Sequence, residues 1–344
     1  MKLKTKSRIA GCFLGLALAS STAVIAQQRG GQQQQNFAQP QGERQATVKE
    51  IAGVISAGAT WKLVWGGPDN ADGIVSAKDG SLLFAQEQPS YVGKIDKNDK
   101  FSIYLQNTHG TGALAIDSKG RLLGAARTCT DPGGHPDQCT EAPGVVQLQP
   151  EFKVLANSFQ GKGVGRPNDL MVDKKGGVYF NSPSGNFYVK PDGEVISISE
   201  TLRTNGIILS RDEKTLYVTN GGTLVAFDVQ PDGSVTNQRD FAKLEAGGNG
   251  DGSTIDSEGR IYISTGPGVQ VVSPEGKFLG LIPSPRNVVS VAFAGPDKKT
   301  LYMVGGGAVG PDGTELKTAP GVRNNAKSIY KIEMLAQGFK GRAK

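Results

Sequence analysis

The chain has 344 residues and a formal net charge of +6, from 38 Lys and Arg against 32 Asp and Glu. Residues 1–26 contain three Lys, one Arg and no acidic residue, so they hold +4 of this charge and leave +2 for the rest. A chain so close to neutral gives no reason to expect a nucleic acid or an anionic membrane surface as a partner.

Residues 1–26 are predicted to be a secretory signal peptide. A basic start is followed by an apolar run from Ile9 to Ile25, and small residues favour cleavage after Ala26. The alternative is a membrane anchor, but the run contains Gly and Ser and is followed by polar sequence. Cys12 follows Ile-Ala-Gly as in a lipidation box, yet mainly charged residues precede it, so we interpret this match as chance. The protein is therefore expected to be exported, either periplasmic or secreted, with no membrane span after signal removal.

Residues 27–45 are rich in Gln, with Gly and Pro interspersed. Such a composition cannot bury a core, so a disordered linker is predicted. Residues 46–344 remain for the folded part, and we expect one domain.

A β-rich unit then occurs six times along the chain. Each copy opens with a small or polar residue, continues into an apolar run, turns and enters a second β run. The six openings are Asp72-Gly73, Gly112-Ala113, Asn168-Asp169, Asn205-Gly206, Asp251-Gly252 and Ser290-Val291. In five of the copies a Gly or Lys lies eight residues after the opening position.

This repeat predicts an all-β fold, a six-bladed β-propeller. A period of about forty residues with several short strands per copy is typical of propeller blades. A third β run follows in every copy, and the segment from Trp61 to Trp65 is predicted to add the strand that closes the ring. The loops at 86–91, 127–144 and 305–325 are expected to set the shape of the ligand-binding pocket of the propeller.

Cys129 and Cys139 lie in a loop rich in Pro and Gly. In an oxidising compartment they are expected to form a disulfide. The alternative is a metal site with His135, but the long spacing without a second ligand pair argues against it.

The opening positions of the six copies should form a ring around the central channel, because the innermost strands of a propeller line it. Two of these positions carry carboxylates, Asp72 and Asp251, and two carry amides, Asn168 and Asn205. Hard oxygen ligands suit Ca²⁺, with Mg²⁺, Mn²⁺ or Zn²⁺ as alternatives. The competing interpretation is that Asn-Gly and Asp-Gly only make turns.

Several segments resemble the gluconolactonase/regucalcin (senescence marker protein) family over residues 68–335. The segments that carry the resemblance are Arg166-Pro167-Asn168-Asp169, Asn205-Gly206-Ile207-Ile208-Leu209-Ser210, Gly250-Asp251-Gly252 and Val291-Ala292-Phe293-Ala294-Gly295-Pro296.

The resemblance implies a six-bladed propeller with one divalent metal on its axis. It implies metal ligands at Asn205 and Asp251, with Asn168 at or beside the metal and Arg166 holding the substrate. The family's first ligand is a Glu in a Glu-Gly pair, whereas this chain has Asp72-Gly73, one methylene shorter. The implied activity is hydrolysis of sugar lactones or other small cyclic esters.

The sequence therefore predicts a metal-dependent lactonase, with Asp251 as general base and a metal-bound water as nucleophile. Arg166 and Asn168 are expected to bind the substrate by orienting its acyl oxygens, and His109 is expected to border the pocket as a further substrate-binding residue. The protein is expected to be a monomer. Two alternatives stay open: an exported propeller that binds a small molecule or a protein without catalysis, and a lyase or strictosidine-synthase-like relative on the same scaffold.

Overall fold

A computed structural model describes residues 42–127, 141–202, 204–317 and 325–344 of the chain. The predicted signal peptide, most of the predicted linker and both Cys129 and Cys139 lie outside these residues. Within them every regular element is a strand, as the β-rich repeat predicts. None of the described segments is a helix of the length and hydrophobicity needed to cross a membrane.

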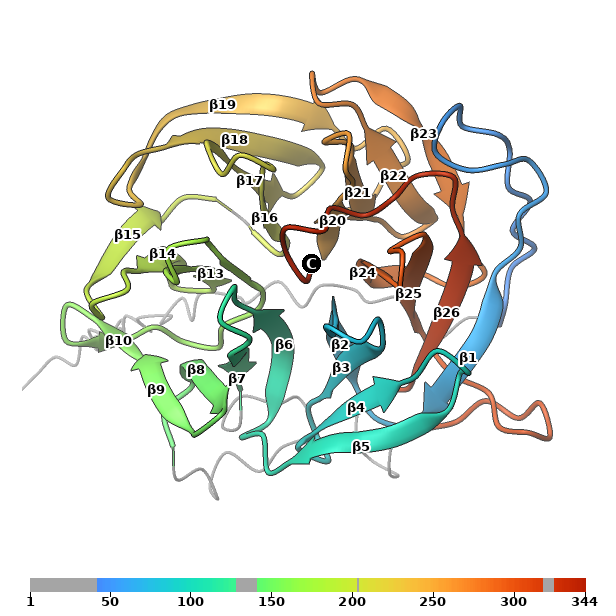
Figure 1. Cartoon of the computed structure of the whole chain (residues 1–344), viewed down its shortest axis with the longest axis horizontal. Coiled ribbons are helices and arrows are strands. Elements are labelled where there is room, and N and C mark those ends of the chain that lie inside the picture. Colours follow the sequence, from blue (N-terminus) through green and yellow to red (C-terminus); the bar gives the residue numbers. More distant parts are fainter. Residues whose placement is uncertain (1–41, 128–140, 203, 318–324) are drawn as a thin grey trace, which may run out of the picture. The chain divides into compact units, whose positions relative to one another are not determined.

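Six four-stranded antiparallel sheets are arranged around a centre, one for each copy of the repeat (Figure 1). Blades 1 to 3 contain β2 Ala71–Ser76, β3 Leu82–Gln86, β4 Tyr91–Ile95 and β5 Phe101–Gln106; β6 Thr111–Ile116, β7 Leu122–Ala126, β8 Gly144–Gln149 and β9 Lys153–Ala156; and β12 Leu170–Val172, β13 Val178–Ser182, β14 Gly185–Val189 and β15 Val195–Ser199. The short pair β10 Ser158–Phe159 and β11 Lys162–Gly163 connects blades 2 and 3.

Blades 4 to 6 continue the ring in chain order. They contain β16 Ile207–Leu209, β17 Thr215–Asn220, β18 Thr223–Val229 and β19 Val235–Lys243; β20 Ser253–Ile255, β21 Ile261–Ser264, β22 Gly268–Val272 and β23 Phe278–Pro283; and β24 Val288–Ala294, β25 Thr300–Gly306 and β26 Lys327–Glu333. The predicted six-bladed β-propeller is thus confirmed.

The fourth strand of blade 6 comes from the opposite end of the chain. Strand β1, Lys62–Gly67, pairs antiparallel with β26. This strand covers most of the segment that was predicted to close the ring. The N-terminal part of the described chain also contacts blades 5 and 6 through Arg44, which lies inside the predicted linker. Arg44 donates to Asn287 Oδ1 at 3.0 Å and to the Gly266 carbonyl at 2.9 Å.

The register of the repeat is visible in the backbone. The residue eight positions after each opening position has a positive φ in all six blades, in the turn between the first and second strands. These residues are Gly80, Gly120, Gly176, Glu213, Gly259 and Lys298. The left-handed conformation favours glycine, yet the turn keeps its shape with Glu or Lys, so the surrounding hydrogen bonds fix it.

The core lies between neighbouring blades. One cluster packs Val75 and Leu83 of blade 1 against Leu114 and Leu122 of blade 2. Similar apolar layers join the other blades, because each sheet buries both faces against its neighbours.

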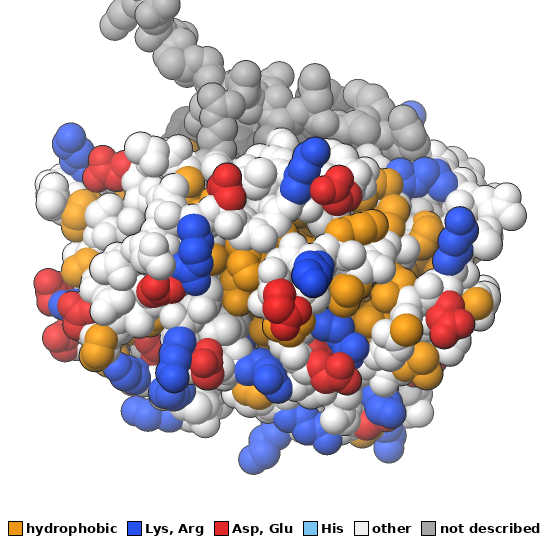
Figure 2. All heavy atoms as spheres, turned by 90° about the horizontal axis from the view of Figure 1, so that it is seen from above, with side chains coloured by type: hydrophobic (Ala, Val, Ile, Leu, Met, Phe, Trp, Pro, Cys, Tyr) orange, Lys and Arg blue, Asp and Glu red, His pale blue; other side chains and the backbone are white. Residues whose placement is uncertain are grey.

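On the face drawn in Figure 2, Lys and Arg side chains alternate with Asp and Glu, with apolar side chains between them.

Candidate functional site

The four oxygen-bearing opening residues lie at one end of the channel. Asp72 is the second residue of β2, and Asn168, Asn205 and Asp251 each lie two residues before the first strand of their blade. These first strands contact one another around the ring and occupy its centre (Figure 1). Because all of them begin at the same end, the four side chains are brought to one rim of the channel.

The glycines after these residues allow close packing and do not form turns. Neither Gly73 nor Gly206 has a positive φ. A Cβ on Gly73 would lie 2.5 Å from the Ala113 Cα, and one on Gly206 would collide with the Asp251 carbonyl. Glycine here lets neighbouring first strands approach, which converges their opening residues. The Asp-Gly and Asn-Gly pairs therefore have a role other than that of simple turns.

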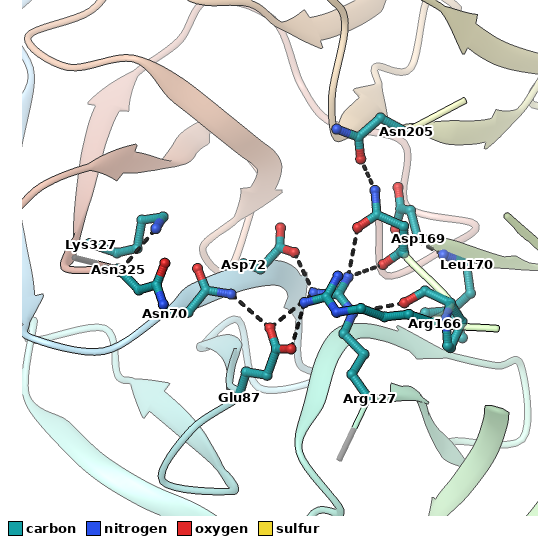
Figure 3. A network of polar contacts seen from close by, with 12 residues as sticks. Asn70, Asp72, Glu87, Arg127, Arg166, Asp169, Leu170, Asn205, Asn325 and Lys327 are labelled. Atoms are coloured by element: carbon teal, nitrogen blue, oxygen red, sulfur yellow. Dashed lines mark hydrogen bonds and ion pairs between the residues drawn. The ribbon is translucent and has the colours of Figure 1, made fainter. Parts of the chain in front are cut away.

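Arg127 is the centre of the polar network at this rim (Figure 3). Its side chain is 1% exposed. The Nη1 atom donates to Asp72 Oδ2 at 2.8 Å and Glu87 Oε2 at 3.2 Å, and Nε donates to the Pro167 carbonyl at 2.8 Å. Nη2 donates to the Asn168 carbonyl and, at 3.0 Å, to Asn168 Oδ1. One guanidinium thus joins blades 1, 2 and 3 and contacts two of the predicted metal ligands.

Blade 2 has no side chain at its opening position, and Arg127 explains why. A Cβ on Gly112 would collide with the Arg127 guanidinium. The space that a side chain at position 112 would fill is occupied by Arg127, which follows the second strand of the same blade. The ring therefore has a cationic member between its oxygen-bearing members.

Glu87 is the buried counter-ion of two arginines. Its Oε1 accepts from Arg166 Nη2 at 2.5 Å and its Oε2 from Arg127, while Asn70 Nδ2 donates at 2.8 Å. Burial opposes ionisation, but the charges of Arg127 and Arg166 outweigh it and hold the pKa of Glu87 below its ordinary value. The carboxylate fixes Arg166, whose side chain remains 25% exposed. The predicted substrate-binding arginine is thus preorganised at the rim.

Sequence reasoning missed Glu87 and Arg127. Each is the residue that directly follows the second strand of its blade. The six residues at this position are Glu87, Arg127, Pro183, Gly221, Thr265 and Gly307. Two charged residues among four uncharged ones are a signal that the repeat comparison would have found, and both begin loops that were expected to shape the pocket.

Asn168 and Asn205 contact each other directly. Asn168 Nδ2 donates to Asn205 Oδ1. The backbone of Asn205 is held by Asn181, whose Nδ2 donates to the Asn205 carbonyl at 2.7 Å, and Asn181 Oδ1 accepts from the Asp169 amide at 2.8 Å. Blades 3 and 4 are therefore linked by amide hydrogen bonds, which fix the two predicted amide ligands.

Asp251 differs from the other carboxylates of the rim, because it forms no ion pair with any described residue. Burial raises the pKa of Asp251 well above its usual range, and the nearby charges of Asp72 and Asp169 raise it further. A half-buried carboxylate beside two others, without a cation of its own, is the electrostatic setting in which a bound cation is stabilised.

These residues fit a hard divalent cation in their donor chemistry. Asp72, Asn168, Asn205 and Asp251 offer carboxylate and amide oxygens, the ligands that Ca²⁺ and Mg²⁺ prefer. No cluster of three His, Cys, Asp or Glu side chains with metal-site geometry occurs in the described ranges, so the fit depends on the two amides.

His109 has other surroundings. Its Nδ1 lies 2.6 Å from Glu141 Oε2, and its ring stacks on Phe152 at a centroid distance of 3.9 Å. The polar network of Figure 3 is built without it.

Comparisons with known proteins place the chain in a family. Residues 64–306 match the family described as SMP-30/Gluconolactonase/LRE-like region. A gluconolactonase from Zymomonas mobilis is 31% identical over 270 residues, which cover 68% of this chain and 75% of that protein. Two further curated relatives are matched over 50% and 64% of their own lengths.

Solved structures show the same fold. A gluconolactonase from Xanthomonas campestris superposes with a TM-score of 0.67 at 18% identity, over 86% of this chain and 98% of that one. A calcium-binding protein, regucalcin, from Agrobacterium tumefaciens superposes with a TM-score of 0.61 at 17% identity, over 81% and 96% of the two chains.

Proposed function

We propose, because the chain belongs to the SMP-30/gluconolactonase/LRE-like family, that it hydrolyses a lactone or a similar small cyclic ester at the rim of the propeller channel. The gluconolactonase that it resembles supports this choice of reaction. The preorganised Arg166 and Asp251, which forms no ion pair with a described residue, would supply complementary groups at the same rim.

One observation carries the proposal. Four blades each contribute an oxygen-bearing side chain to one end of the channel, and the carboxylate of Asp251 has no ion-pair partner among the described residues. In a purely structural ring we would expect every buried carboxylate to be paired, as Glu87 is.

Asp72, Asn168, Asn205 and Asp251 would hold one divalent cation, for which we propose Ca²⁺. Such a cation, when bound, supplies Lewis-acid polarisation of a carbonyl oxygen and favours the ionised form of nearby carboxylates. The shorter Asp72 accepts a hydrogen bond from Arg127 at its Oδ2, so this ligand position is also held by the arginine.

The chain's own residues would carry the proton transfer. Asp251 would accept a proton from the attacking water as the water oxygen bonds to the acyl carbon. The bond between the acyl carbon and the ring oxygen then breaks, and the ring oxygen takes up a proton, which gives a hydroxy acid. Arg166, fixed by Glu87, would orient the oxygens of the acyl part by hydrogen bonding.

The test measures hydrolysis of a panel of sugar lactones by pH-stat titration of the acid released. Elemental analysis measures the metal content of the same protein. We expect hydrolysis that chelator abolishes and Ca²⁺ restores. Asp251→Ala should remove the activity, whereas Asp228→Ala, a substitution in an exposed ion pair on the outer part of blade 4, should not. Hydrolysis that is equally fast with chelator would contradict the metal role. Binding of lactones without turnover would instead support a non-catalytic binding protein.

A further inference from the structure

The last residues of the sequence cross the other end of the channel. Residues 334–344 leave β26 and run to the centre of the ring, where the C-terminal end lies in Figure 1. The Ser76 amide donates to the Ala343 carbonyl at 3.0 Å, and the Ser257 amide donates to the Gln337 carbonyl at 2.7 Å. Ser76 ends β2 and Ser257 follows β20, so this segment lies where the first strands end, opposite the rim of the candidate site.

Long basic side chains fasten the segment. Arg342 Nη1 donates to the Ser210 carbonyl at 3.0 Å, and its Nη2 donates to the Leu209 carbonyl at 2.5 Å. Lys298 Nζ donates to the Phe339 carbonyl at 3.0 Å. These bonds join the segment to blades 4 and 6 and define its path toward the channel.

Lys344 extends from this segment into the channel. Its side chain is 3% exposed, and its Nζ lies 2.5 Å and 2.7 Å from the two carboxylate oxygens of Asp169. Asp169 directly follows Asn168 in the sequence and is one of the charges that raise the pKa of Asp251. The ammonium group of Lys344 therefore approaches the candidate metal ligands from the opposite end of the channel.

Seven charged residues are linked around the candidate ligands in the part of the chain that the structure describes. Their side chains sum to one negative charge when all are ionised, the residues being Asp72, Glu87, Asp169 and Asp251, and Arg127, Arg166 and Lys344. A divalent cation needs two negative charges to be neutralised, and Ca²⁺ affinity follows the charge of the site. Lys344 therefore removes one negative charge from this group by pairing with Asp169, and its loss would favour a divalent cation.

We infer that Lys344 is a positioning residue that lowers the affinity of the rim for divalent cations by neutralising Asp169. The inference depends on the proposed function, because it concerns the cation that the rim would hold. The ammonium group of Lys344 thus sets how tightly the rim binds a divalent cation.

The experiment is calorimetric titration of the full chain with Ca²⁺ after chelator treatment, without any activity measurement. Lys344→Met should tighten the dissociation constant about tenfold, since it removes one buried positive charge near the site. Asp169→Asn should weaken it by a similar factor. The double variant, which restores the charge sum, should return to the wild-type value, and Lys344→Arg should also remain close to it.

Lys340→Met is the matched control, because it removes one positive charge from the same segment at an exposed position. If Lys344→Met and Lys340→Met bind Ca²⁺ equally, or if Lys344→Met binds it more weakly, the inference is wrong while the metal site stands. If neither the wild-type protein nor any of the variants binds Ca²⁺, the proposed metal site itself is wrong. The double variant keeps the comparison available should Lys344→Met alone not fold, because it leaves no unpaired buried charge.

Discussion

Blades 1 to 3 and blades 4 to 6 surround the same channel with different chemistry. On the first side, Arg127 joins three blades, and Glu87 pairs with two arginines in full burial. On the second side, the opening residues are Asn205, Asp251 and Ser290, and the residues after the second strands are Gly221, Thr265 and Gly307. Asp251 pairs with no cation among the described residues, and Asn205 is held by the neutral amide of Asn168. The comparison shows that one half of the rim is fixed by ion pairs, while the described part of the other half relies on neutral hydrogen bonds and one carboxylate without a counter-ion.

The largest effect should come from breaking the first half at Arg127. Arg127→Met removes the guanidinium and leaves the buried Glu87 without one of its two cations, so the free energy of unfolding should fall by about 3–5 kcal/mol. Chemical denaturation measures this change. Arg239→Met, which breaks an exposed pair with Asp228, should cost about 0–1 kcal/mol. Equal losses in the two variants would contradict the central role of Arg127.

Asp251→Asn tests the second half. The amide keeps the shape of the side chain but cannot accept a proton as a carboxylate does, so lactone hydrolysis should fall by at least about a hundredfold. The melting temperature should not fall, because the carboxylate that is removed is destabilised by its carboxylate neighbours. Activity assays and calorimetry separate the two effects. A clear loss of stability with retained activity would place Asp251 in the structural half.

Asp72 lies at the boundary between the two halves, since it contacts Arg127 and also belongs to the predicted ligand set. Asp72→Asn retains a hydrogen-bond acceptor for Arg127 but removes a negative charge, so Ca²⁺ binding should weaken about tenfold. Asp72→Glu should retain binding. Calorimetric titration compares the two variants, and unchanged affinity in Asp72→Asn would remove this residue from the site.

Ser290 should give the smallest effect. It holds the opening position in blade 6 and is buried next to Gly252, where its Oγ and backbone leave no space for a further side chain. Ser290→Ala should change Ca²⁺ affinity less than twofold and the free energy of unfolding by about 1 kcal/mol or less. A tenfold loss of affinity in this variant would extend the ligand set to a fifth blade.

The sequence predicted the parts of the molecule that depend on local pattern. The blades and their number could be predicted from the β runs and from the turn residues eight positions after each opening. Strand alternation and turn chemistry act over a few residues, so a single sequence shows them. The same register placed Asp72, Asn168, Asn205 and Asp251 at one end of the channel.

The partners of these residues could not be predicted in the same way. Arg127 meets Asp72 across 55 positions, and Lys344 meets Asp169 across 175. Such contacts depend on how the blades pack and on which side chains the channel leaves room for, as with Gly112 and Arg127. A single sequence contains no periodic signal for a charge that enters the channel from another blade or from the C-terminal segment.

The pairing of β1 with β26 has a consequence for the order of folding. Glu43 and Tyr330, which are hydrogen-bonded at 2.5 Å beside this pairing, are separated by 287 positions. Blade 6 therefore cannot be completed until β26 has been synthesised, and closing so long a loop is slow relative to forming a local hairpin. Until that moment β1 lacks its pairing partner, and unpaired strand edges are prone to aggregate. Residues 334–344 follow β26 directly, so the segment that crosses the channel is synthesised only after the strand that completes blade 6.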